Sequence, residues 1–125
     1  MGPYLPILAV SLGGVLGANA RYLVAVYVAE RLGTAFPYGT LLINVSGSLV
    51  IGFFLTLAAE RFSVDPLWRL FFATGFLGAY TTFSTFVRES HALVSADEHR
   101  AALAYVAVSV LAGVTAALAG MAVAS

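Results

Sequence analysis

The chain lacks cysteine altogether, so it can form neither a disulfide bond nor a thiolate metal site. Charged residues are also scarce: they make up 10% of its 125 residues, against about a quarter of a soluble globular domain. Six basic and six acidic side chains cancel, so no nucleic-acid partner is expected. With 61% hydrophobic residues and a mean hydropathy of +0.96, the chain is expected to be an integral membrane protein.

Carboxylates are missing from the centres of the apolar ranges. Each acid stands at the end of such a range or in a connector: Glu30, Glu60, Asp65, Glu89, Asp97 and Glu98. No His, Asp or Glu residues recur at a metal-ligand spacing, and no nucleophile in an apolar range has a neighbouring base. The chain is therefore predicted not to be an enzyme. Any ion flux through it is expected to be passive, because nothing in it couples to protons or ATP.

The apolar residues form four ranges, each long enough to cross a bilayer as an α-helix, which takes about 20 residues. They are residues 5–29, 38–59, 67–87 and 101–123, with polar connectors at residues 30–37, 60–66 and 88–100. Since they use nearly the whole chain, we predict an all-α membrane protein with one four-helix transmembrane domain over residues 1–125. Gly13 and Gly17 lie four residues apart, a spacing that favours close helix packing.

The third range is the least regular of the four. Gly75 and Gly78 are followed by a run of hydroxyl and phenylalanine side chains over residues 81–86. Glycine lowers helix stability, and hydroxyl side chains compete for backbone hydrogen bonds. We therefore expect the third helix to be broken near its middle, around residues 75–82. A kink bridged by water is the alternative. Irregular backbone at membrane depth must be covered by protein or line a cavity, so this segment is the expected functional centre.

The arginines produce almost no topological bias. The side that carries both termini would hold Arg61 and Arg69, and the opposite side Arg31, Arg88 and Arg100. Because the Lys/Arg bias of the loops sets orientation, the chain is predicted either to insert both ways up or to prefer weakly the three-arginine side in the cytoplasm. Four helices can hardly enclose a solute path, so a homodimer is expected.

Several polar residues lie inside the apolar ranges, where they are costly and functional candidates by default. Thr40, Asn44 and Ser48 recur every four residues and share one helix face, as Tyr105 and Ser109 do in the fourth range. The amide of Asn44 has two N–H donors. Both interpretations stay open for it: a solute ligand, or a hydrogen bond between helices.

Two further features suit an anion. Phe83 and Phe86 are three residues apart, and the positive edge of a phenyl ring can hold a desolvated anion. Contact with lipid or with apolar side chains is the alternative. Arg21 is the only charge well inside a range. Its side chain can extend to the interface or raise the anion concentration at a pore mouth.

Three sets of residues, one in each of the first three ranges, form recognisable motifs. They are Gly14-Val15-Leu16-Gly17-Ala18 with Arg21-Tyr22, Tyr38-Gly39-Thr40-Leu41 with Asn44 and Gly47, and Gly75-Phe76-Leu77-Gly78 with Thr81-Thr82-Phe83-Ser84-Thr85-Phe86. These motifs resemble the Fluc (CrcB-type) fluoride channel family, and the resemblance covers all four ranges in order.

The resemblance implies a fluoride-selective passive channel in the inner (plasma) membrane that exports F⁻ and protects against fluoride toxicity. It implies an antiparallel, dual-topology homodimer with two pores, embedded in the lipid bilayer. The implied cofactor is one structural Na⁺ at the dimer centre, held by the backbone carbonyls of Gly78 and Thr81 from both subunits.

The resemblance also assigns the pore residues Asn44, Phe83, Phe86, Tyr105 and Ser109. Because fluoride is small and strongly hydrated, several donors must replace its water, and Thr40, Thr82 and Ser84 add hydroxyls. Arg21 is the candidate for the vestibule. Two positions depart from the family pattern. Ala79 stands where a second glycine often follows Gly78, and Gly113 stands where related sequences can carry a third hydroxyl.

Two other classes of small membrane protein are alternatives to a channel. A small multidrug antiporter would need a carboxylate inside the membrane, typically in the first range, which holds no acid before Glu30. A non-transporting structural subunit is compatible with the small-residue packing, but it leaves Asn44 and the hydroxyl and phenylalanine run unexplained.

Overall fold

The computed structural model describes residues 2–125, and within them all regular structure is helical. Met1 of the predicted domain lies outside the described residues. The elements are α1 (Tyr4–Leu32), α2 (Tyr38–Glu60), α3 (Pro66–Arg69), the π-helix η1 (Leu70–Leu77), α4 (Gly78–Tyr80), α5 (Phe83–Ser95) and α6 (His99–Ala124).

The prediction of four membrane-length helical segments is confirmed. They run over Tyr4–Leu32, Tyr38–Glu60, Pro66–Ser95 and His99–Ala124, and each is apolar enough to cross a bilayer. The first, second and fourth predicted ranges end within three residues of these bounds. The third segment is built from α3, η1, α4 and α5 in succession.

The predicted third connector, residues 88–100, is wrong. Helix α5 continues to Ser95, and the turn to α6 occupies only residues 96–98. The apolar range ends at Val87, but the next eight residues still form an amphipathic helix because Leu93 packs in a buried cluster with Ala102 and Tyr105 of α6. Hydropathy alone therefore underestimates this helix, since only one of its faces is apolar.

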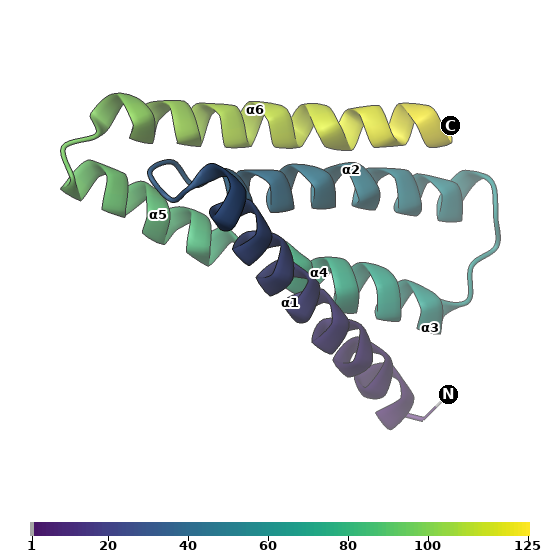
Figure 1. The fold of residues 1–125 in the computed structure, drawn as a ribbon. Coiled ribbons are helices and arrows are strands. Elements are labelled where there is room, and N and C mark those ends of the chain that lie inside the picture. Colours follow the sequence, from purple (N-terminus) through teal and green to yellow (C-terminus); the bar gives the residue numbers. More distant parts are fainter. Residues whose placement is uncertain (1) are drawn as a thin grey trace.

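Helices α2 and α6 make the most extensive contact of the bundle and lie side by side along most of their length (Figure 1). Helix α1 crosses the third segment obliquely and packs mainly on η1 and α4. Both termini and the connection between α2 and α3 lie at one end of the bundle, as four crossings require. The connection between α1 and α2 and the turn between α5 and α6 lie toward the other end.

Glycine determines how closely α1 approaches the third segment. A Cβ atom on Gly13 would overlap the Phe71 carbonyl, and one on Gly17 would overlap the Phe76 carbonyl. From the other side, a Cβ on Gly75 would lie 2.7 Å from the Val10 carbonyl oxygen. Gly75 therefore lies inside the helical segment and serves packing, and the extended backbone begins only at Thr81. In a bilayer such backbone contact replaces hydrophobic attraction as the source of helix association.

Replacing Gly13 by alanine is expected to destabilise the protein by about 1–3 kcal/mol, because the new methyl group meets backbone that cannot move without shifting η1. The neighbouring Gly14→Ala variant is the matched control, since its Cβ would lie 3.9 Å from the nearest atom, the Gly75 carbonyl oxygen. The measurement is the midpoint of thermal unfolding in detergent. Equal midpoints for the two variants would contradict the packing of α1 on η1.

Candidate functional site

Asn44 of α2 holds the extended backbone between α4 and α5. Thr81 (φ −80°, ψ 156°) and Thr82 (φ −149°, ψ 118°) are both extended. The Thr82 N–H donates to Asn44 Oδ1 at 2.8 Å, and Asn44 Nδ2 donates to the Thr82 carbonyl at 3.0 Å. One amide side chain therefore satisfies both backbone polar groups of Thr82, and one of its two N–H donors is left for another acceptor.

These extended residues leave the carbonyls of residues 78–81 without the donors of a continuous helix, and two of these carbonyls are those of Gly78 and Thr81. In a continuous α-helix the Thr82 N–H would donate to the Gly78 carbonyl, and the Thr85 N–H would donate to the Thr81 carbonyl. Here the Thr82 N–H donates to Asn44 instead, and the Thr85 N–H donates to Thr82 Oγ1 at 3.2 Å. Gly78 and Thr81 thus lose the donors that a helix would give them. They are the two residues to which the family resemblance assigns a cation.

Of the two carbonyls between them, that of Ala79 has a donor from another helix. Arg21 of α1 donates its Nε–H to the Ala79 carbonyl at 3.0 Å. The expectation that Arg21 either extends to the interface or faces a vestibule is incomplete, because its innermost donor is bonded to the backbone beside the extended residues.

A cavity of about 370 Å³ lies against this segment, and we call it the threonine cavity. It brings together most of the predicted site residues: Asn44, Gly78, Thr81, Thr82, Phe83, Phe86 and Ser109. The Ser109 Oγ atom is buried and makes no hydrogen bond among residues 2–125. Ser48 also lines the cavity, but its hydroxyl donates to the Asn44 carbonyl at 2.7 Å. A Cβ on Gly113 would lie 3.7 Å from Ser48 Oγ. The Ser48 hydroxyl is therefore close to the position at which related sequences can carry a hydroxyl residue in place of Gly113.

The two phenylalanines border this cavity in different ways. Their ring centroids are 5.7 Å apart at an interplanar angle of 51°. Phe83 is 75% exposed, whereas Phe86 is half-buried and packs on Tyr105 with centroids 5.2 Å apart. The Phe86 ring therefore packs partly inside the chain, and the Phe83 ring lies at its surface.

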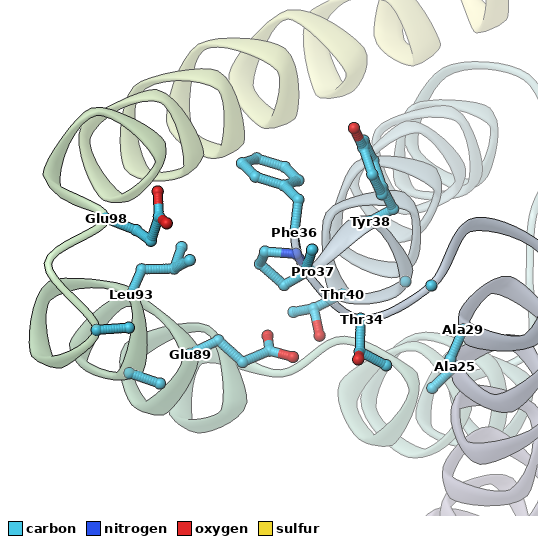
Figure 2. Close-up of a pocket in the computed structure, with 15 residues that line it drawn as sticks. Ala25, Ala29, Thr34, Phe36, Pro37, Tyr38, Thr40, Glu89, Leu93 and Glu98 are labelled. Carbon is cyan, nitrogen blue, oxygen red and sulfur yellow. The ribbon is translucent and has the colours of Figure 1, made fainter.

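Thr40 lines a second cavity of about 340 Å³, the loop cavity, near the connection between α1 and α2. Tyr105 is fully buried, and its hydroxyl donates to Glu89 Oε1 at 2.9 Å. Thr40 is 5% exposed and lines the cavity together with Glu89 and Glu98. In Figure 2 the Glu89 carboxylate extends from α5 in the direction of the Thr40 hydroxyl. Phe86 of the threonine cavity packs on Tyr105, and Tyr105 is bonded to Glu89 of the loop cavity.

Glu89 is the functional candidate that the sequence interpretation misses. From the sequence, Glu89 is assigned to the connector at residues 88–100, and this is wrong. Glu89 lies within α5, where it is half-buried and accepts a hydrogen bond from Tyr105. A helical continuation past Val87 would have revealed it, because Phe86 and Glu89 are three residues apart and share a helix face. Arg21 and Ser84 line neither cavity, although Ser84 Oγ lies 3.4 Å from Thr82 Oγ1.

Four membrane-length helices define a multi-pass helical membrane protein, and three of them line an open cavity that holds neutral donors and aromatic rings. The family model described as "CrcB-like protein, Camphor Resistance (CrcB)" matches residues 8–121. The chain therefore belongs to the CrcB family, and the resemblance seen in the motifs is confirmed.

Three curated relatives illustrate the similarity, and each is named fluoride-specific ion channel FluC. The protein of Acidobacterium capsulatum is 48% identical over 114 residues, which cover 91% of both chains. That of Chloroflexus aurantiacus is 45% identical over 115 residues, or 92% of this chain and 91% of the relative. That of Koribacter versatilis is 58% identical over 81 residues, or 65% of this chain and 64% of the relative. The relatives are named as ion channels and not as enzymes, in agreement with the sequence prediction.

Changing Asn44 to aspartate is expected to cost about 1–3 kcal/mol of stability at neutral pH, because a carboxylate oxygen would face the Thr82 carbonyl in place of the Nδ2–H donor. Part of the loss should be recovered as the pH falls, since a protonated carboxyl can again donate. The matched control is Asn19→Asp, whose amide donates to the Val15 carbonyl of its own helix in an exposed position. Thermal unfolding in detergent measures both; equal effects would show that the contact with Thr82 is dispensable.

Proposed function

We propose that this chain forms a passive, fluoride-selective channel in the inner (plasma) membrane, which exports F⁻ and so protects the cell against fluoride toxicity. The observation that carries the proposal is the threonine cavity with its buried, unpartnered Ser109 hydroxyl. A buried hydroxyl without a partner costs about 1–3 kcal/mol, and a small anion in the cavity would accept its hydrogen bond. The names of the relatives point to the same ion.

The remaining groups in the cavity fit an anion that must both enter and leave. Asn44 retains one N–H donor after its bond to Thr82, and the edges of Phe83 and Phe86 present positive charge without a formal cation. Such neutral donors bind fluoride well enough to replace its water and weakly enough to release it. Tyr105 donates to Glu89 in the protomer, so an ion that approaches Tyr105 competes with a carboxylate for that hydroxyl.

The functional unit is an antiparallel homodimer with two pores. Phe83 leaves most of its ring uncovered in the protomer although it borders the threonine cavity, and a second copy of the chain would cover it. The arginines support opposed orientations, with Arg61 and Arg69 at one end and Arg31, Arg88 and Arg100 at the other. In this arrangement the extended residues Thr81 and Thr82 interrupt the third crossing inside the bilayer.

The carbonyls of Gly78 and Thr81 are suited to hold one Na⁺ between the two subunits. Within the described residues no three His, Asp or Glu side chains gather, so a cation there would be held by backbone oxygens. The two carbonyls lack their helical donors, and carbonyl groups at membrane depth need a partner. Four such oxygens from two subunits would replace the water of a small monovalent cation. The ion would supply electrostatic cross-linking of the dimer and would not be transported.

Liposomes loaded with potassium fluoride are expected to release fluoride rapidly when they contain the purified protein and a potassium ionophore. The physical reason is that the donors lining the threonine cavity can replace the water of fluoride, and fluoride accepts stronger hydrogen bonds than chloride does. A fluoride electrode measures the release. Vesicles without protein and vesicles loaded with potassium chloride are the controls, and equal release of chloride would refute the proposal.

Dimer stability is expected to depend on Na⁺ although Na⁺ is not transported. Prolonged exchange of all sodium for a large organic cation should shorten the lifetime of the dimer, because the Gly78 and Thr81 carbonyls would then face one another without a cation. Gel filtration follows the dimer, and return of sodium is the control for irreversible damage. A dimer that persists unchanged after verified removal of sodium would rule out the structural ion.

A further inference from the structure

Arg21 occupies a defined place in the contact between α1 and the third segment. Gly13, Gly17 and Arg21 follow one another at intervals of four residues and therefore share one face of α1. The first two let α1 touch the backbone of η1, and the third donates its Nε–H to the Ala79 carbonyl of α4. The close approach made by the glycines brings the arginine stem within reach of that carbonyl.

The Ala79 carbonyl needs a donor from outside its own helix. In a continuous α-helix it would accept from the N–H of Phe83, but α4 ends at Tyr80 and the two extended threonines precede α5. A carbonyl at a helix end must find another partner, and in a bilayer water is not available for this. A guanidinium group is a favourable one, because it also complements the negative end of the helix dipole.

We propose that Arg21 is a positioning residue, whose Nε–H caps the Ala79 carbonyl and fixes the end of α4 against α1. The cap engages Ala79 and leaves the neighbouring Gly78 and Thr81 carbonyls free to point at a shared cation. That last consequence rests on the proposed function, whereas the capping itself does not. Asn44 holds the segment at Thr82 from α2, so Arg21 and Asn44 fix its two sides from two different helices.

The bond to Ala79 is made by Arg21 Nε, so a capping role can be distinguished from a purely electrostatic role of the guanidinium group. Nε is the guanidinium nitrogen nearest the backbone, and this is the one hydrogen bond that Arg21 makes among residues 2–125. The terminal nitrogens stay available to attract anions, so positioning and attraction use different atoms of one side chain. Glutamine has its amide nitrogen the same number of bonds from Cα as Nε, whereas methionine has similar length and no donor.

The test compares Arg21→Gln with Arg21→Met by backbone hydrogen exchange over residues 79–85, in lipid nanodiscs with sodium and without fluoride. The methionine variant is expected to exchange this segment about tenfold faster than the unaltered chain, since it loses a bond to a charged donor. The glutamine variant is expected to stay within about threefold, because it keeps a neutral donor at the same place. Equal acceleration in both variants, or none in either, overturns the proposal.

Arg31→Gln and Arg31→Met are the matched controls, because Arg31 lies near the end of α1 and stacks on Tyr27 at 4.8 Å. Neither should change exchange over residues 79–85.

If the Arg21→Met variant does not fold, the Arg21→Gln variant decides alone: near-normal exchange and melting temperature support the cap, and strong acceleration overturns it. Since exchange requires no fluoride, a chain that fails to transport this ion can still have the cap, and a transporting chain can lack it.

Discussion

A bilayer offers no water to backbone polar groups, so the extended residues of the third segment must find their hydrogen-bond partners within the protein. At Thr81 and Thr82 the helical ladder is interrupted, so several N–H and C=O groups need partners from elsewhere. Asn44 satisfies Thr82, and Arg21 satisfies Ala79. The Gly78, Tyr80 and Thr81 carbonyls are left without the donors that a continuous helix would give them.

The surrounding helices are arranged so that these partners can reach the extended residues. Glycines on α1 and in η1 remove the side chains that would hold Arg21 away, and the long contact between α2 and α6 supports Asn44 on one side and Ser109 on the other. The same extended segment that needs stabilising also borders the cavity that we propose conducts fluoride. Support of the backbone and formation of the anion site are therefore two consequences of one geometry.

Much of the fold could be predicted from hydropathy, because four long apolar ranges in a short chain can only be membrane helices. Three of them were located to within three residues. The third was cut short at Val87, since the last two turns of α5 have one polar face and depend on Leu93 packing against α6. That error also misplaced Glu89, which the structure brings into contact with Tyr105. The candidate site residues of α2, α5 and α6 could be predicted from their spacing and from the motifs. The residues to which they form hydrogen bonds could not be predicted in this way.

Hydropathy and motifs are local properties of the chain, so they are enough to predict the class of protein, the number of crossings, the family and the residues that mark its centre. What each of these residues touches depends on how the helices pack. From the sequence, Asn44 could be either a solute ligand or a contact between helices. In the structure its amide hydrogen-bonds both the N–H and the carbonyl of Thr82. From the sequence, the Arg21 side chain could either extend to the membrane interface or face a vestibule. In the structure its Nε–H donates to the Ala79 carbonyl. These outcomes depend on distances between residues far apart in the chain, and such distances are set only when α1 and α2 pack on the third segment.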